Sequence, residues 1–146
     1  MEVHITYHKN GNRHEEYNLL DNLKHGKCTE YFEDGETIWM ICEYNKGLQS
    51  GQSTLFFHNG DIHTQGHYEN GVKHGEWIEF NKQNKIVNKG KFVHGEKEGF
   101  WTEDSLSNGK YEHNKKIGSW FKKRFNIVEH TQFDAGKIQH KILNWN

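Results

Sequence analysis

Hydrophobic and polar residues alternate along most of this chain in short runs that turn signals separate. In one run Ile62, Thr64, Gly66 and Tyr68 share one parity, and polar residues stand between them. Each run is about seven residues long, which suits a β-strand and is too short for an independent helix. Because side chains on a strand switch face at every residue, the pattern predicts strands with one face rich in large side chains.

The runs belong to a phrase that recurs about every two dozen residues, and its clearest copy, GHYENGVKHGEW, extends from Gly66 to Trp77. The second glycine of the phrase recurs at spacings of 25, 24, 24 and 19 residues, at Gly26, Gly51, Gly75, Gly99 and Gly118. Hairpin-turn dipeptides stand between copies, at Asn10-Gly11, Asp34-Gly35 and Asn59-Gly60. In the fifth copy Asn114 replaces the first glycine, which implies a positive φ, and the short spacing implies a trimmed turn or strand.

The sequence therefore predicts an all-β fold, an elongated single-layer antiparallel β-meander of about five to six β-hairpin repeats with about a dozen strands. Residues 1–146 form a single repeat domain in this interpretation, and segments 1–20 and 127–146 are atypical caps. Only 32% of the residues are hydrophobic, yet 14% are aromatic and none is proline. This composition fits a thin sheet with large side chains on one face and argues against disorder.

The turn lengths also predict which residues lie opposite each other. We expect three pairs on the core face, Tyr31 with Ile38, Phe56 with Ile62, and Phe80 with Ile86. We expect Tyr44, Tyr68, Phe92, Tyr111 and Phe133 on that same face. The same register places Cys28 opposite Ile41, on the face away from Cys42, and so predicts two free thiols.

Three tryptophans, Trp77, Trp101 and Trp120, have the other parity and share it with Glu79, Glu103 and Lys122. One interpretation is a ladder of partner-binding residues on the polar face, because aromatic residues are enriched at interface hot spots. The alternative is that the rings lie flat over glycines within the strands, at Gly66, Gly90 and Gly109. Both interpretations stay open at this point.

The phrase Gly-x-Tyr-x-x-Gly-x-x-x-Gly-x-Trp resembles the MORN repeat, and most closely the variant form of bacterial proteins described as antitoxin-like. The best copies extend from Gly66 to Trp77 and from Gly90 to Trp101, and the resemblance covers roughly residues 7–136. Cys28 and Ser53 stand where the family has tryptophan. The resemblance implies a β-hairpin repeat fold and a role as a scaffold, lipid-associated module, antitoxin or immunity protein, and it brings no catalytic residue.

Charge is unevenly distributed, although the net charge is only -1. Residues 1–109 carry 11 Lys/Arg and 17 Asp/Glu, whereas residues 110–146 carry 8 and 3. The local basic cluster is a candidate anion-binding site, made of Lys115, Lys116, Lys122, Lys123 and Arg124. The two cysteines and the lack of a signal pattern or a bilayer-spanning apolar run predict a cytoplasmic protein.

The residue patterns of catalytic and metal sites are not found in this sequence. His63 and His67 are four apart, but on a strand this puts them about 13 Å apart along the chain, too far to share an ion. No serine lies in a strand-turn-helix elbow, and no glycine-rich loop opens a helix. We therefore expect no enzyme, no metal site and no cofactor.

Three functional hypotheses follow. The first is a protein-binding module, including an antitoxin or immunity protein that blocks a partner enzyme, with the acidic first part suited to a basic partner. The second is binding of anionic lipid or nucleic acid through the basic cluster, which would weaken steeply with salt. The third is self-assembly through open strand edges, with the segment 137–145 as a cap or dimer contact.

Overall fold

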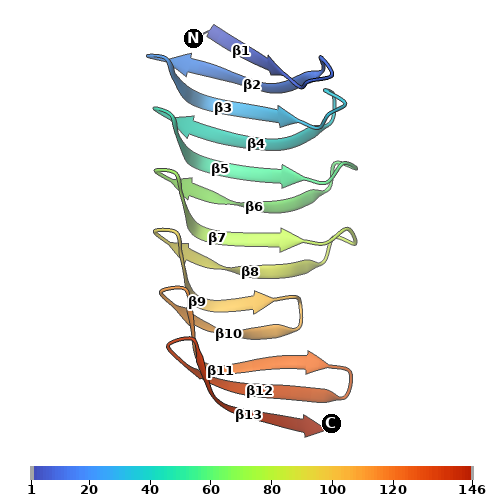
Figure 1. The fold of residues 1–146 in the computed structure, drawn as a ribbon, viewed down its shortest axis with the longest axis vertical. Helices are drawn as coiled ribbons and strands as arrows, with labels where there is room; N and C mark the ends of the chain where they lie inside the picture. Colours follow the sequence, from blue (N-terminus) through green and yellow to red (C-terminus); the bar gives the residue numbers. More distant parts are fainter. Residues whose placement is uncertain (1, 146) are drawn as a thin grey trace.

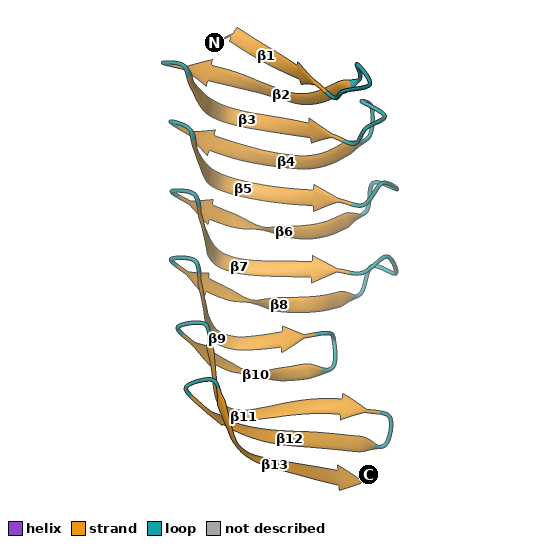
Figure 2. Cartoon of the chain, in the orientation of Figure 1, coloured by secondary structure: helices purple, strands orange, loops and turns teal. Residues whose placement is uncertain are grey.

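The structure, a computed structural model, describes residues 2–145 as one antiparallel sheet in which each strand pairs with its neighbours in sequence (Figure 1, Figure 2). Within these residues there are thirteen strands and no helix. The strands are β1 (Glu2–Tyr7), β2 (Arg13–Leu20), β3 (Leu23–Tyr31), β4 (Ile38–Asn45), β5 (Leu48–Phe56), β6 (Ile62–Glu69), β7 (Val72–Phe80), β8 (Ile86–Val93), β9 (Glu96–Glu103), β10 (Ser107–Glu112), β11 (Lys115–Arg124), β12 (Ile127–Asp134) and β13 (Lys137–Trp145). The predicted all-β, single-layer antiparallel meander is confirmed.

Tight two-residue turns join the strands on one side of the sheet, at the strand ends on the left in Figure 1. Both residues of each turn have positive φ, as in Asn70 (49°) and Gly71 (83°), which is the geometry of a type I′ hairpin. Asn114 has the predicted positive φ of 63°. The shortening of the fifth copy falls on the other edge, where residues 104–106 connect β9 to β10 and β10 has only 6 residues.

The tight turns also bind each copy to the copy before it. In each case a turn amide donates to the carbonyl of a residue near the start of an earlier strand: Gly47 to Lys24 (2.8 Å), Gly71 to Gln49 (2.8 Å), Gly95 to Lys73 (2.9 Å), Asn114 to Lys97 (3.2 Å) and Gly136 to Lys116 (2.9 Å). The repeats are therefore linked by backbone hydrogen bonds beyond the strand ladders, which keeps successive turns in one column.

The predicted turn-proximal pairs are confirmed, since Tyr31 lies opposite Ile38, Phe56 opposite Ile62 and Phe80 opposite Ile86. A bulge was expected in the turns beside Phe56 and Phe80 but not beside Tyr31, and in the structure the register of the strand pair shifts next to all three pairs. In β4 the extra residue is Trp39, so Glu30 pairs with Met40. Tyr31 and Glu30 are consecutive and point to opposite faces, so Ile38 and Met40 also lie on opposite faces. The predicted core face was therefore wrong for the residues next to the turns.

The same bulge corrects the predicted cysteine register. Cys28 lies directly opposite Cys42, and it is Thr29 that lies opposite Ile41. Both side chains are almost completely buried, at 0% and 1% exposure, and they form a small core with Met40. Both thiols are free, as predicted, but not because they lie on opposite faces.

The three tryptophans lie on the same face as the aromatic residues Phe92 and Tyr111. Trp77 is directly opposite Gly90, and two residues along each strand Gly75 is directly opposite Phe92. Paired residues share a face, and so do residues two apart on one strand, so Trp77 and Phe92 lie on the same face. We call this surface the Trp face. Of the two interpretations of these tryptophans, the exposed ladder on the polar face is wrong, and the placement over in-strand glycines is the one observed. A Cβ atom on Gly66, Gly90 or Gly109 would collide with the ring of Trp77, Trp101 or Trp120 respectively.

The rings form a continuous core along the repeat axis. Their order is Tyr68, Trp77, Phe92, Trp101, Tyr111, Trp120 and Phe133, with centroids 5.0 to 6.4 Å apart and planes nearly perpendicular. Edge-to-face contact of this kind is the favoured arrangement of aromatic pairs. The indole N–H of Trp101 donates to the Lys91 carbonyl at 3.2 Å, and the other two do likewise to His67 and Lys110. Cys28 and Ser53 occupy the tryptophan position in the first copies and are also buried.

Gly90→Ala tests the packing of Trp101 against the sheet. The new methyl group would occupy the position of the indole, and overpacking of this kind costs about 1–3 kcal/mol of unfolding free energy. The measurement is urea unfolding followed by tryptophan fluorescence. Lys91→Ala, one residue away on the exposed opposite face, is the control and should change stability by less than about 0.5 kcal/mol. Equal stability of the two variants would contradict the placement of the ring.

Candidate functional site

Two charged rows flank the aromatic core on the Trp face. The position four residues before each tryptophan position forms the Lys row, made of Lys24, Gln49, Lys73, Lys97 and Lys116. The position two residues after it forms the acid row, made of Glu30, Leu55, Glu79, Glu103 and Lys122. Each row is mainly of one sign, with a neutral residue in the second copy and a lysine at the end of the acid row. The rings therefore lie between a basic and an acidic wall.

The Lys row covers the rings. The Nζ atom lies over the indole at 4.2 Å for Lys73 on Trp77, 4.4 Å for Lys97 on Trp101 and 3.9 Å for Lys116 on Trp120. Gly75 (φ +72°) lies between Lys73 and Trp77, and Gly99 and Gly118 occupy the equivalent positions in the next two copies, also with positive φ. These left-handed glycines bend the strand, visible near the start of β7 in Figure 1, so that the lysine reaches back over the ring. Only 4% to 5% of each tryptophan remains exposed.

Glu103 is the most heavily bonded residue of the acid row. It lies 2.8 Å from the Lys97 ammonium, 3.0 Å from that of Lys116 and 2.7 Å from the Tyr111 hydroxyl, which donates to it. Burial disfavours its charged form, but the hydrogen bonds from these three groups outweigh burial and lower the pKa of Glu103 to about 2. Burial, reinforced by the Glu103 carboxylate, raises the pKa of Tyr111. Glu103 therefore remains ionised and ties two copies of the repeat together.

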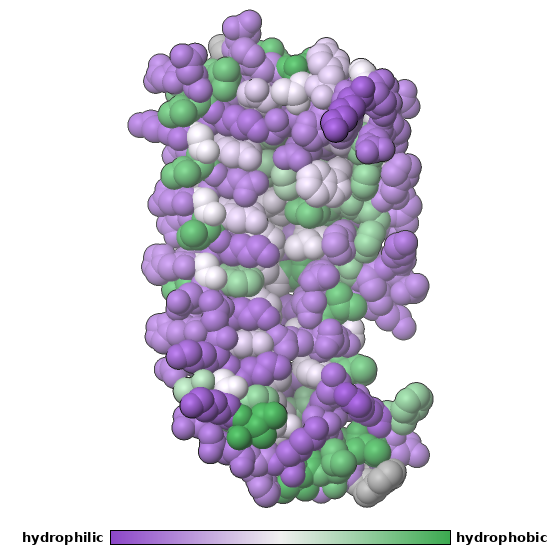
Figure 3. All heavy atoms as spheres, in the orientation of Figure 1, coloured by the Kyte–Doolittle hydropathy of each residue, from purple (hydrophilic) through white to green (hydrophobic). Residues whose placement is uncertain are grey.

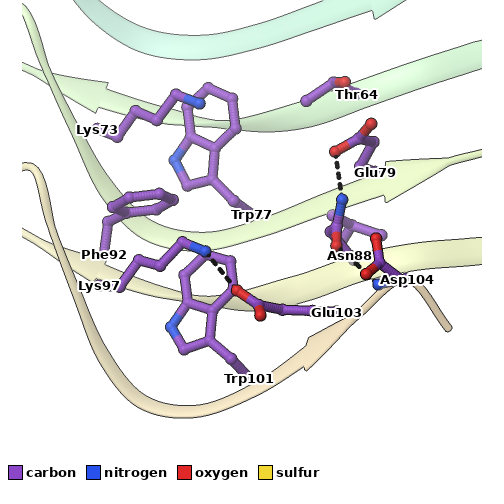
Figure 4. Close-up of a pocket in the computed structure, with 11 residues that line it drawn as sticks. Thr64, Lys73, Trp77, Glu79, Asn88, Phe92, Lys97, Trp101, Glu103 and Asp104 are labelled. Carbon is purple, nitrogen blue, oxygen red and sulfur yellow. Dashed lines mark hydrogen bonds and ion pairs between the residues drawn. The ribbon is translucent and has the colours of Figure 1, made fainter. Parts of the chain in front are cut away.

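A groove with a volume of about 410 Å³ lies between the rows over β6 to β9. Figure 4 shows Trp77 and Trp101 on its floor, Lys73 and Lys97 along one side, and Glu79, Glu103 and Asp104 along the other. A second groove of about 210 Å³ follows over β9 to β12, and the two share Glu103 and Asp104 as lining residues. The Trp face thus carries an elongated depression that crosses several copies.

Lys73 and Glu79 are the least engaged charged groups of the groove. The Lys73 ammonium lies over two aromatic rings, Trp77 and Phe92, and forms no ion pair among the described residues. Burial lowers the pKa of Lys73, against the opposing effect of Glu79. Glu79 accepts a hydrogen bond from the Asn88 amide at 2.8 Å and lies 3.6 Å from His63. Both groups remain able to bind a charged group of a ligand.

The predicted basic cluster does not form one patch. Lys115 and Lys116 begin β11 whereas Lys122, Lys123 and Arg124 end it, so the two groups lie about 20 Å apart along the strand. Lys116 lies over Trp120 and is paired with Glu103, and Lys123 lies on the face opposite to Lys122. Anion binding by these residues remains a prediction that the structure neither requires nor tests.

Large exposed apolar side chains also lie outside the two grooves. Trp39, the bulged residue of β4, is 39% exposed and lines a hollow of about 570 Å³ with Phe32, Phe56 and Phe57 at the loop edge. The last strand, β13, exposes Ile138 (62%), Ile142 (40%) and Leu143 (53%). Figure 3 shows a largely hydrophilic face on which hydrophobic atoms gather toward the C-terminal end.

The sequence contained the signal for the Lys row, but local charge counts do not reveal it. When the copies are aligned on the second glycine, a lysine recurs two residues before it in four of five copies, Lys24, Lys73, Lys97 and Lys116. Counting charges along contiguous sequence instead placed Lys116 in a basic cluster. Position within the repeat, and not proximity in sequence, decides which lysines act together.

Comparison with known proteins finds one family model that matches part of this chain. A family model described as a protein of unknown function (DUF2963) matches residues 7–49, which correspond to the region from the end of β1 to the start of β5. No curated protein matches the chain. Among residues 2–145 there is no helix with the length and hydropathy that a membrane crossing requires.

The acid row gives a pH-dependent prediction. Because folding lowers the pKa of Glu103, its contribution to stability is complete above the unfolded pKa near 4.5 and is lost as the pH falls toward 2. Glu103→Gln should therefore lower the unfolding free energy at pH 7 by roughly 1–3 kcal/mol, and the difference from wild type should shrink below pH 4.5. Urea unfolding at several pH values measures this difference. A pH-independent difference would contradict the ion-pair assignment.

Proposed function

We propose that this chain is a non-catalytic protein-binding module whose Trp face holds an extended segment of a partner protein. The elongated groove over β6 to β12 is the observation that supports this proposal. A peptide segment is long and narrow, so it matches a depression that crosses several repeats better than a compact small molecule does.

The chemistry of the groove suggests what such a segment would carry. Lys73 offers an ammonium without an ion pair, and Glu79 offers a carboxylate bonded to a neutral amide. A partner segment with charged side chains of both signs would complement them, and the aromatic floor between the rows would contact its apolar parts. The tryptophans act in this proposal as a rigid floor beneath the lysines and not as protruding anchors.

The resemblance of the repeat phrase to MORN-variant proteins described as antitoxin-like supports a more specific proposal. In it, the chain is an antitoxin or immunity protein and the bound segment belongs to an enzyme that it blocks. The excess of acidic residues in 1–109 favours a basic partner, because complementary charge accelerates encounter.

Thr64→Arg and Gln65→Arg form a matched pair that tests the groove. Thr64 lines it, whereas Gln65 is the next residue of β6 and points to the other face, so both variants add the same charge and bulk. Immobilised wild type and variants are exposed to a lysate of the native host at moderate salt, and retained proteins are quantified by mass spectrometry. We expect Gln65→Arg to retain one stoichiometric protein that Thr64→Arg loses by at least about tenfold.

Two results would contradict this proposal. Retention of the same protein by both variants would exclude the groove as its binding site, and Trp39→Ala would then test the loop-edge hollow. Retention of nucleic acid or lipid alone, and only at low salt, would instead favour the basic residues of β11.

Self-association through strand edges is a second candidate function. In the described sheet β1 and β13 are the two end strands, and each has only one strand neighbour. The outer edge of each could therefore pair with a strand of another molecule. The exposed aliphatic residues Ile138, Ile142 and Leu143 on β13 would add apolar contact to such pairing. End-to-end association would extend the groove across two molecules.

Ile142→Lys tests this second function. A lysine on an edge strand blocks edge pairing, so the variant should remain monomeric at concentrations where wild type forms dimers in sedimentation velocity. Leu106→Lys, at an exposed loop position (48%), is the control and should associate as wild type does. A wild-type mass that does not change with concentration would exclude self-association as the function.

A further inference from the structure

The column of tight turns brings together two histidines that are twenty residues apart in sequence. The amide of Gly95 donates to the Lys73 carbonyl at 2.9 Å, which places the β8–β9 turn against the start of β7. His94 precedes Gly95 and His74 follows Lys73, so their rings meet with centroids 5.5 Å apart. Glu69 at the end of β6 completes the group, with its carboxylate 3.3 Å from the Nδ1 atom of His74.

The donor atoms of this group converge. One nitrogen from each histidine and one oxygen of Glu69 all lie within 4.8 Å of one another. The Nδ1 atom of His74 is shielded from solvent and forms no hydrogen bond, although the Glu69 carboxylate lies 3.3 Å away and the whole side chain is 33% exposed. The Nδ1 atom of His25, at the same position in the first copy, also forms no hydrogen bond, but no second histidine lies at the paired turn position there, which is Lys46. An unsatisfied shielded nitrogen costs free energy, and a bound cation is a group that would satisfy it.

The next copy provides an internal comparison. His113 and Glu98 occupy there the positions of His94 and His74, joined by the equivalent bond from Asn114 to the Lys97 carbonyl. The Nδ1 atom of His113 lies 2.8 Å from Glu96 and 3.3 Å from Glu98, and these carboxylates raise the pKa of His113. The Nδ1 atom of His113 therefore already has a hydrogen bond with Glu96, whereas the Nδ1 atom of His74 forms none.

We propose that Glu69, His74 and His94 form a binding site for a divalent transition-metal ion of the zinc class. Two imidazoles and one carboxylate are a ligand set that suits zinc, whereas magnesium and calcium prefer oxygen ligands alone. Tetrahedral zinc holds such donors about 2.1 Å from the ion, and hence roughly 3.4 Å from each other. The side chains need only close from their present separation of up to 4.8 Å.

A metal ion at this site would join two strands and a turn, from two copies of the repeat. Glu69 ends β6, His74 lies near the start of β7, and His94 lies in the turn after β8. Binding would therefore stabilise the docking of one copy on the next. Three protein ligands leave a coordination position open at the exposed turn edge, opposite to the face that carries Lys73.

The chain supplies its own conservative variants for the test. The preceding copy has Ser50 at the position of His74 and Asn70 at that of His94, and Asn70 has the same φ of 49°. His74→Ser and His94→Asn should therefore fold normally. His113→Asn makes the same change one copy later and is the control.

Zinc affinity of the untagged full chain is measured by competition with a chromophoric chelator at neutral pH. We expect one zinc ion per chain, an affinity at least about tenfold weaker in His74→Ser and His94→Asn, and no change in His113→Asn. Imidazole nitrogen chemical shifts of His74 and His94 should also move on zinc addition. Absence of zinc binding would overturn the proposal. Zinc binding that His74→Ser and His94→Asn retain but Cys28→Ser abolishes would also overturn it, because the ion would then lie at Cys28.

Discussion

The fold depends on the contact between a tryptophan ring and a glycine on the neighbouring strand. A single-layer sheet has no second layer to cover its core, so each copy must bury its apolar surface with its own side chains. The ring of Trp101 can lie on the sheet only because Gly90 has no Cβ atom, and its indole N–H then reaches a backbone carbonyl. Repeating this contact stacks the rings edge to face and produces the core of a chain with few aliphatic residues.

The same constraint explains why charged residues lie so close to the core. The ring needs a cover, and a lysine supplies a long apolar stem together with an ammonium that is attracted to the indole face. The acid row then neutralises part of the Lys row, most completely at Glu103. What remains between the rows is a groove with an aromatic floor and walls of opposite charge, and the proposed binding function rests on that groove.

The turn column shows how one backbone geometry acquires different chemistry in different copies. The bond from each turn to the preceding copy brings the same two positions together every time, but the residues there differ. They are Asn70 with Ser50 in one copy, His94 with His74 in the next and His113 with Glu98 after that. Of these combinations only the middle one brings two imidazoles together, with Glu69 beside them, which is why the proposed metal site is placed in that copy.

The sequence by itself determined the strands, the turns and the meander, because the turn dipeptides, the period-2 alternation and the positive-φ glycines are local properties of the chain. It even gave the correct pairs beside the longer loops, such as Tyr31 with Ile38. The tertiary structure decided the face. A single bulged residue such as Trp39 reverses the parity of the rest of its strand, and this placed Cys28 opposite Cys42 and the tryptophans in the core. Likewise the groove and the His74–His94 contact arise from pairing between copies, which the local sequence does not specify.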